Sequence, residues 1–191
     1  VVASGGVVKT IAAKGCADKS RKFFDDLIKF AQSVGAKGLG YLRWMDGEVQ
    51  SPIAKFLSEE TLNQLKELGN VEDGDVMFFI ADKAKLATEV GAAIRDELGK
   101  QLDLIDPDVF KFCWIVDFPM YELDEKTGKI EFSHNPFSMP QGGMDALMAA
   151  DTEEKQLDLL AYQYDIVCNG VELSSGAIRN HKPEAMYKAF D

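Results

Sequence analysis

The first hundred residues alternate between short apolar runs and amphipathic helical patterns, and this alternation constrains the fold more than any other feature. Residues 7–12, 39–45 and 75–80 are rich in β-branched and aromatic residues, which favours strands. Each run precedes a segment with apolar residues at helical spacing, as in the helix predicted over residues 21–34. We therefore expect a β-α-β-α-β-α unit that forms a two-layer α/β sandwich, whose strand order the sequence leaves open.

Capping residues set the ends of the predicted helices. Ser20 and Ser58 stand just before the first two helical patterns, where a side-chain oxygen can accept a hydrogen bond from a free backbone N–H. Asp82 occupies the same place before the third pattern, so we expect it to cap that helix. Gly35 and Gly69 follow the first two patterns and are expected to end those helices.

The chain changes character at Asp106-Pro107, where we expect a boundary between domains at residues 1–105 and 106–191. Residues 110–116 form an unbroken apolar run, typical of a strand buried on both faces. The further predicted elements are a hairpin at 121–132, a Pro- and Gly-rich loop at 135–144, strands at 164–168 and 171–173, and a helix at 183–190. The expected fold class is α/β (α+β).

The net charge of −11 falls almost wholly on the second part of the chain. Residues 1–100 hold 14 Lys and Arg against 15 Asp and Glu, whereas residues 101–191 hold 7 against 17. Nucleic-acid-binding domains usually present a basic face, so this chain by itself is not expected to bind RNA strongly. If it serves RNA chemistry, other parts of the protein must hold the RNA.

The cysteines and the lack of long apolar stretches indicate the cellular setting. Cys16, Cys113 and Cys168 lack the spacing of a metal site or a disulfide framework, which favours a reducing cytoplasmic location. No apolar stretch approaches the roughly 18 residues of a membrane span, so no membrane partner is expected. The chain opens on an apolar run without an initiating Met, and we expect it to be an internal fragment of a longer protein.

A carboxylate, a small-residue segment and a lone arginine form the first candidate site. Glu172 lies in a predicted strand, and a turn over residues 174–176 follows, in which Ser175 and Gly176 would let a ligand approach the backbone closely. Arg179 is the only arginine of the acidic second part, and its planar guanidinium suits a carboxylate bound through two hydrogen bonds. The alternative is a structural ion pair with one of the neighbouring carboxylates.

A second candidate site surrounds His134, which follows a predicted strand and precedes a Pro-rich loop beginning at Asn135. The alternative is a half-buried histidine bonded to backbone. Asp117 ends the apolar run and could bind a ligand or cap the following turn. No nucleophile elbow, phosphate-binding loop or dinucleotide fingerprint is present, so no catalytic side chain is assigned. This pattern suits a reaction driven by substrate positioning and charge neutralisation.

Several segments, in order and spacing, resemble one family. They are residues 114–120 (WIVDFPM), 134–137 (HNPF), 169–172 (NGVE) and 176–184 (GAIRNHKPE). Together they are similar to the catalytic domain of bacterial-type aspartyl-tRNA synthetases, which belong to class II. Residues 1–100, with 35–39 (GAKGL) and 52–57 (PIAKFL), resemble the domain inserted in those enzymes and shared with a subunit of the tRNA-dependent amidotransferase. The resemblance implies a mixed, mainly antiparallel catalytic sheet in the second part.

The resemblance also implies an activity and its site. The parent enzyme would use ATP to activate L-aspartate as aspartyl-adenylate and then transfer it to tRNA, with Mg²⁺ neutralising the phosphates. Arg179 would hold the side-chain carboxylate of aspartate, His134 would help to bind aspartate, and Glu172 would lie on the ATP side as a Mg²⁺ ligand. Asp117, Asn135, Ser175 and Gly176 are further pocket candidates. The parent is expected to be a cytoplasmic homodimer.

The chain departs from the family pattern in two places. Asn135 follows His134 where the family often has two histidines, and residues 174–176 read Ser-Ser-Gly where it often has three glycines. The anticodon-binding β-barrel, the arginine segment before the insert and the Gly-rich segment after it are missing, so we expect the chain alone not to aminoacylate. Two alternatives stay open: a non-catalytic α/β module that binds tRNA or a partner subunit, and an unrelated domain that binds a small dicarboxylate.

Overall fold

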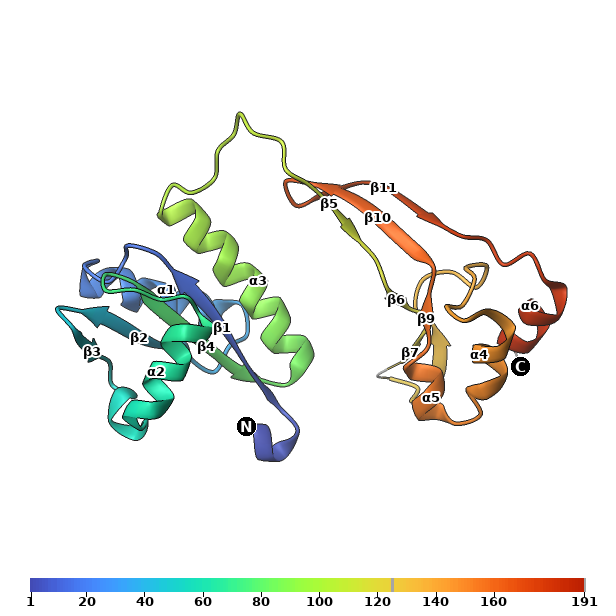
Figure 1. Cartoon of the computed structure of the whole chain (residues 1–191), viewed down its shortest axis with the longest axis horizontal. Coiled ribbons are helices and arrows are strands. Elements are labelled where there is room, and N and C mark those ends of the chain that lie inside the picture. The colour runs from blue at the N-terminus through green and yellow to red at the C-terminus, as the bar shows by residue number, and fades with distance from the viewer. Residues whose placement is uncertain (125, 191) are drawn as a thin grey trace. The chain divides into compact units, whose positions relative to one another are not determined.

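The computed structural model describes residues 1–124 and 126–190, and the chain divides into two compact units, Val1–Asp106 and Pro107–Asp191. Each unit combines helices with antiparallel strands (Figure 1), which confirms the α+β class. Within the described part of the chain, no helix has both the length and the apolar character needed to cross a membrane.

A four-stranded antiparallel sheet forms the centre of the first unit, in the order β1-β4-β2-β3. Its strands are β1 (Val7–Ala13), β2 (Gly40–Met45), β3 (Glu48–Gln50) and β4 (Val76–Asp82). The short strand β3 was not predicted. Asp46 and Gly47 join it to β2 with φ angles of 56° and 77°, the left-handed pair that suits a two-residue hairpin turn.

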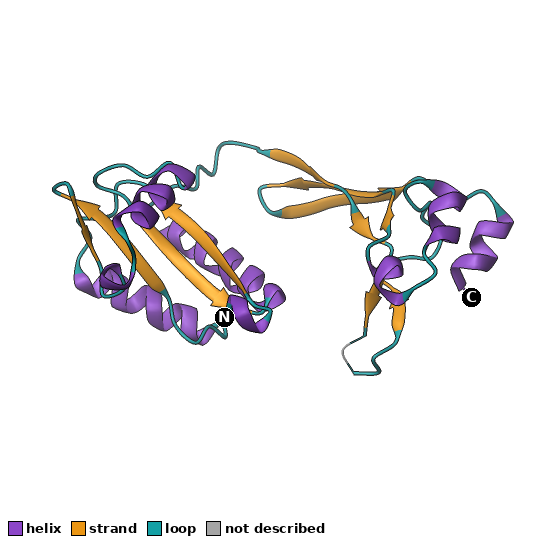
Figure 2. Ribbon diagram, turned by 60° about the horizontal axis from the view of Figure 1, so that its bottom comes forward, coloured by secondary structure: helices purple, strands orange, loops and turns teal. Residues whose placement is uncertain are grey.

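Helices cover both faces of this sheet, and Figure 2 shows them in purple beside the orange strands. On one face, α1 (Arg21–Ser33) and α3 (Ala84–Gln101) pack their apolar stripes against β4. On the other face, α2 (Glu59–Leu68) and the 3-10 helix η2 (Ala54–Phe56) pack around Trp44 and Met77. The two-layer prediction therefore holds for α1 and α3, whereas α2 adds a third layer.

The capping predictions for the first two helices are confirmed, and the third is wrong. The Oγ of Ser20 accepts a hydrogen bond from the Phe23 N–H at 3.3 Å, and Ser58 caps α2 in the same way. Asp82 instead is the last residue of β4, where it pairs with Val7 of β1. Because this pairing keeps Asp82 extended, the N-cap of α3 moves one residue on, to Lys83, which makes no side-chain cap.

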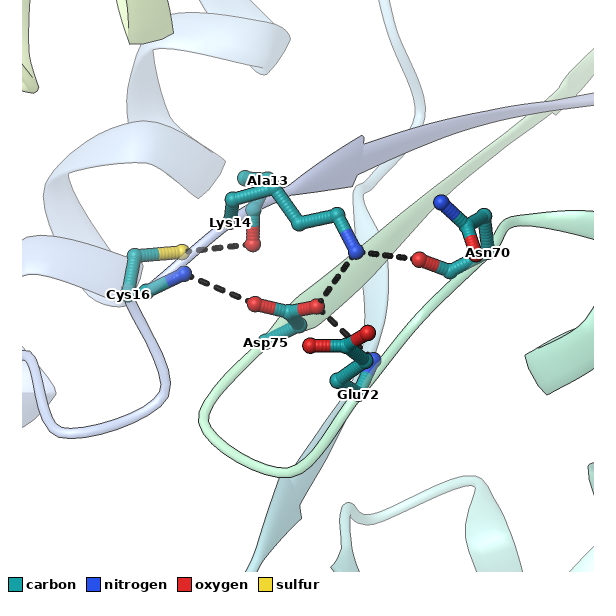
Figure 3. A network of polar contacts seen from close by, with 7 residues as sticks. Ala13, Lys14, Cys16, Asn70, Glu72 and Asp75 are labelled. Atoms are coloured by element: carbon teal, nitrogen blue, oxygen red, sulfur yellow. Dashed lines mark hydrogen bonds and ion pairs between the residues drawn. The ribbon is translucent and has the colours of Figure 1, made fainter.

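A buried carboxylate joins two loops of the first unit (Figure 3). Asp75 is 5% exposed and accepts hydrogen bonds from the Gly15 N–H at 2.8 Å, the Glu72 N–H at 2.8 Å and the Lys14 ammonium at 2.9 Å. The Lys14 ammonium also donates to the Asn70 carbonyl. Burial alone would raise the pKa of Asp75, but these donors outweigh it and hold the pKa below its ordinary value.

The second unit contains a three-stranded antiparallel sheet in the order β11-β10-β5, with two smaller strand pairs beside it. The sheet strands are β5 (Phe112–Ile115), β10 (Gln163–Cys168) and β11 (Val171–Ala177). The pairs are β6 (Phe118–Pro119) with β9 (Leu160–Ala161), and β7 (Tyr121–Leu123) with β8 (Ile130–Phe132). The predicted hairpin at 121–132 is confirmed as β7–β8, and its residue 125 lies outside the described residues.

The second unit has its own apolar core beside α4 (Gly143–Ala149), α5 (Glu153–Leu157) and α6 (Pro183–Phe190). This core contains Met120, Leu147 and Ala185 at its centre. Helix α6 confirms the predicted closing helix, whereas α4 was not predicted and begins inside the expected loop. A short 3-10 helix, η1 (Val2–Ser4), opens the first unit.

The apolar strand β5 was expected to be buried on both faces, and in this chain it is exposed. Phe112 and Trp114 are 60% and 59% exposed, and Cys113 and Ile115 between and beside them are exposed as well. An apolar run in the sequence predicts that a strand is covered, but it does not identify what covers the strand.

The different burial of the three cysteines can be tested by thiol modification. Burial, followed by the charge of Asp75, raises the pKa of Cys16 to about 11, and the thiol is fully buried. Cys168 is also buried, whereas Cys113 is exposed. Because a buried neutral thiol reacts slowly, we expect an aromatic disulfide reagent at pH 8 to modify one thiol of the native chain rapidly. Peptide mapping should identify it as Cys113, and rapid modification of Cys16 would contradict the fold.

Replacing Asp75 should destabilise the first unit. Asp75→Asn removes the charge that three donors share, and hydrogen bonds to a charged group are worth about 1.5–3 kcal/mol. We expect urea unfolding at pH 7, followed by Trp44 fluorescence in a Trp114→Phe background, to show a loss of about 2 kcal/mol. Asp18→Asn, at an exposed carboxylate of the same unit, is the control and should change stability by less than about 0.5 kcal/mol.

The same substitution should change the pH dependence in a fixed direction. The folded pKa of Asp75 is lower than the unfolded value of about 3.9, so its stabilisation is complete above that value and disappears as pH falls through the folded pKa. The stability difference between wild type and Asp75→Asn should therefore shrink below about pH 4. A difference that stays constant down to pH 2 would contradict the role given to the carboxylate.

Candidate functional site

A one-residue shift in strand pairing decides which side chains of β11 lie together. Ile166 pairs with Ser174, but the next residue of β10, Val167, pairs with Glu172, so Leu173 is an extra residue on β11. Such a β-bulge resets the alternation of side chains along its strand. Directly opposed residues of antiparallel strands point to the same face of the sheet.

This pairing places Glu172 and Ser175 on one face of the sheet. Their partners on β10 are Val167 and Asp165, and Gln163 follows on the same face two residues further along. Without the bulge, Glu172 and Ser175 would point to opposite faces, since three residues separate them. The bulge therefore turns the Glu172 carboxylate to the face that Gln163 occupies.

The predicted turn at residues 174–176 is wrong, because β11 continues through them to Ala177. Gly176 pairs with Tyr164, and a Cβ atom on Gly176 would lie 2.5 Å from the Tyr164 ring. That ring in turn contacts Trp114 edge-to-face, with centroids 5.7 Å apart. In this chain the small residue makes room for a tyrosine of the neighbouring strand, on the face opposite Ser175.

Hydrogen bonds connect the loop that follows His134 to β10 and to the segment after β11. Ser138 is 1% exposed and donates to the Asn135 side chain at 2.7 Å, and Asn135 donates to Gln163 at 3.3 Å. The Met139 N–H donates to the carbonyl of residue 178, and the Asn180 N–H donates to the carbonyl of residue 137, both at 2.8 Å. Asn135 is thereby held over the face that carries Glu172.

Arg179 lies two residues beyond the end of β11, opposite Ser138 in an isolated β-bridge. The carbon of its guanidinium is 3.9 Å from the centroid of the Phe137 ring, and the side chain is exposed. Among residues 1–124 and 126–190 it forms no ion pair, so the structural salt bridge considered from the sequence is not observed. The aromatic ring fixes the plane of the guanidinium and leaves its N–H groups for a ligand.

His134 precedes this loop, and Asp117, between β5 and β6, contacts its residue Gln141. His134 is exposed, with Nδ1 3.1 Å from the Ser133 hydroxyl and its ring 4.9 Å from that of Phe118, so its observed partner is a side chain and not backbone. Asp117 has a left-handed φ of 59° and accepts a hydrogen bond from the Gln141 amide at 2.8 Å. Side-chain and backbone bonds thus connect the loop to Asp117 and to the segment beside Arg179.

Glu172 stands apart from these residues. Arg179 is seven positions further along a largely extended chain, which corresponds to about 23 Å at roughly 3.3 Å per residue. Asp165 was missed from the sequence, although an acid inside an apolar strand is a recognisable signal. Its Oδ1 is buried without a hydrogen-bond partner in the described part of the chain, and it shares a face with Glu172. No cluster of three or more metal-binding side chains occurs within the described residues.

The fold and the site can now be compared with known proteins. The family model described as "GAD domain" matches residues 1–90, which lie within the first unit. Over 190 residues, the chain is 57% identical to the aspartate–tRNA(Asp/Asn) ligase of Rickettsia africae and 57% identical to that of Rickettsia prowazekii. It is 56% identical to the same enzyme of Rickettsia bellii.

These alignments cover 99% of the chain but 32%, 31% and 32% of the three ligases, respectively. The chain therefore spans about a third of the length of the curated relatives that it matches. The resemblance to aspartyl-tRNA synthetases expected from the motifs is confirmed along nearly the whole sequence.

The buried Ser138 hydroxyl gives a test of the loop geometry. Ser138→Ala removes the bond to Asn135, and a lost buried hydrogen bond costs about 1–2 kcal/mol. We expect amide hydrogen exchange at Met139 and Asn180 to become about 5- to 30-fold faster, because local opening becomes easier by that amount. Ser133→Ala, a neighbouring hydroxyl outside the bonded loop, is the matched control and should leave both amides unchanged.

Proposed function

We propose that this chain is part of an aspartate–tRNA ligase and carries the later part of its aspartate and ATP pocket. The observation that carries the proposal is the Arg179 guanidinium, which is stacked on Phe137 and engaged by no carboxylate of the described residues. A placed but unpaired arginine in so acidic a unit suits an acidic ligand. The similarity to ligases whose names specify aspartate supports aspartate as that ligand.

The proposed reaction has two steps. A carboxylate oxygen of the aspartate α-carboxyl group attacks the α-phosphorus of ATP, and the bond to pyrophosphate breaks, which gives aspartyl-adenylate. A hydroxyl of the terminal tRNA ribose then attacks the activated carbonyl, and AMP leaves. Neither step needs a protein nucleophile, since positioning and charge neutralisation lower both barriers.

The loop and strand ends supply the aspartate side of the pocket. Arg179 binds the side-chain carboxylate of aspartate through two parallel N–H···O bonds. His134, held by Ser133 and Phe118, contributes a further polar contact to aspartate. Asn135 and Asp117 hold the loop in place through Gln163 and Gln141, so they position the pocket.

The sheet face with Glu172 supplies the ATP side. Glu172, Ser175 and Asp165 share this face, and the buried Oδ1 of Asp165 lacks a partner among the described residues, which fits a missing cation or donor. Mg²⁺ is commonly bound by one or two carboxylates together with substrate phosphates, and it would neutralise the phosphates of ATP. Glu172 and Asp165 are the side chains that would hold it. Gly176 contributes by admitting the Tyr164 ring on the opposite face.

The proposal extends to the parent protein. The exposed apolar side chains of β5 would be covered by segments that the longer ligases have and this chain does not, and tRNA would be held mainly by those segments. We infer that this chain alone does not aminoacylate, and that the parent works in the cytoplasm as a homodimer. Turnover by the isolated chain with ATP, aspartate and tRNA would contradict this inference.

Substitution of Arg179 in the full-length ligase tests the function. Arg179→Lys keeps the charge but loses the bidentate geometry. We expect this to remove about 2–4 kcal/mol of transition-state stabilisation, which corresponds to a 30- to 1000-fold fall in kcat/KM for aspartate. Pyrophosphate exchange measures this value, and the KM for ATP should change less than about threefold. Arg95→Lys, at an exposed arginine of the first unit, is the matched control and should retain full activity.

Two outcomes would count against the assignment. Equal losses for aspartate and ATP would show that Arg179 supports the fold of the pocket and does not read aspartate. Unchanged exchange in Arg179→Lys, combined with tRNA binding by residues 1–100 alone, would favour the non-catalytic module considered from the sequence.

A further inference from the structure

The first unit contains a cavity of about 490 Å³ that the proposed ligase chemistry does not use. It lies between α1, the start of β2 and the loop after β3, all within Val1–Asp106. Its apolar walls come from Ile28, Leu39, Pro52 and Ile53. Cavities of this size and mixed lining accommodate small organic molecules or the end of a peptide.

An arginine lies on the inner wall of this cavity. Leu42 and Trp44 of β2 belong to the core beneath α2, so the alternation of the strand puts Arg43 on the opposite face, toward α1. The carbon of its guanidinium is 5.2 Å from the centroid of the buried Phe24 ring. The cation therefore lies against the main core of the unit and not in bulk solvent.

The protein leaves this cation almost unpaired. Arg43 donates a hydrogen bond from Nη2 to the Met45 sulfur at 3.6 Å, and a thioether is a weak acceptor. The Nε of Arg43 is buried and has no partner within the described residues, and no carboxylate of those residues forms an ion pair with it. A partly buried guanidinium without an acceptor is costly, because its lost hydration is not replaced.

The walls around Arg43 are held in place by contacts of their own. The Tyr41 ring stacks on Phe24 at 4.6 Å with an interplanar angle of 21°. The Ser51 hydroxyl donates to the Tyr41 carbonyl and accepts from the Ile53 N–H at 3.1 Å, which fixes the loop over β2. The cavity is thus formed by the resting fold and does not need a ligand to build it.

A second arginine stands at the rim. Arg21 is 93% exposed and lies 3.7 Å from Asp25, a long surface ion pair that holds it weakly. The two cations at the cavity outnumber this one carboxylate, so the cavity favours a single negative charge. Residues 1–100 as a whole carry 14 basic against 15 acidic side chains, and this balance gives no broad positive field for a polyanion such as RNA.

The geometry points to a binding site for a carboxylate with an apolar body, in which Arg43 binds the carboxylate and Ile28 and Ile53 contact the apolar part. The carboxylate supplies the acceptors that Nε and the Nη groups of Arg43 lack. The ligand is either a small organic acid or the carboxyl-terminal residue of a peptide, because both present the same group. The site does not depend on the ligase function.

Titration of the isotope-labelled 191-residue chain by NMR tests the site. The probe is phenylacetate, the uncharged control is phenylacetamide, and inorganic phosphate is the anion without an apolar body. We expect saturable shifts at the Arg43 Nε–H and the methyl groups of Ile28 and Ile53 with phenylacetate, and at least tenfold weaker binding of both controls. The peptide Ala-Ala-Leu is compared with its C-terminal amide, which lacks the carboxylate. Tighter binding of the free peptide than of phenylacetate identifies the carboxyl-terminal residue of a peptide as the ligand.

Matched variants separate binding from folding. Arg43→Gln should weaken phenylacetate binding at least tenfold without lowering the thermal midpoint, because the side chain that it replaces makes no strong bond in the fold. Arg95→Gln removes the same charge from the surface of α3, where Arg95 pairs with Asp96, and should leave binding unchanged. Equal binding of phenylacetate and phenylacetamide, equal binding of phosphate, or equal loss in both variants would overturn the proposal.

Discussion

The pairing of β10 with β11 is the constraint on which the candidate site depends. Its one-residue shift at Leu173 gives Glu172 the same face as Asp165, and the chain just outside the two strands provides the backbone groups to which the loop around Ser138 is bonded. Every candidate side chain of the second unit except His134 and Asp117 is placed by this pair or by its continuation. The site is thus a product of strand register more than of any single motif.

Buried charged groups of this chain fall into two kinds. In the first unit, Asp75 is enclosed but fully satisfied by Lys14 and backbone N–H groups, so it connects two loops. Arg43 and Asp165 each have a buried polar atom without a partner in the described part of the chain. A satisfied charge stabilises a fold, whereas an unsatisfied one is tolerated where a ligand completes it. Asp75 therefore has a structural role, whereas Arg43 and Asp165 are candidates for ligand contacts.

Local signals predicted the fold well where local chemistry decides it. Ser20 and Ser58 set the starts of α1 and α2 because a cap needs only the next turn of backbone. Asp82 failed because pairing with Val7, a partner far away in the chain, overrode its capping preference. Residues 174–176 were read as a turn for the same reason: small residues favour turns locally, and the Tyr164 ring that requires Gly176 lies on another strand. The site motifs were visible in the sequence, but the bulge that orients Glu172 was not.

The exposed apolar strand β5 has a consequence for biosynthesis. A sheet with an open edge and uncovered aromatic side chains is a template for pairing with any other unfolded chain nearby. On a polysome, neighbouring nascent copies offer such partners at high local concentration. Any partner that covers β5 during folding would therefore also protect the chain from aggregation.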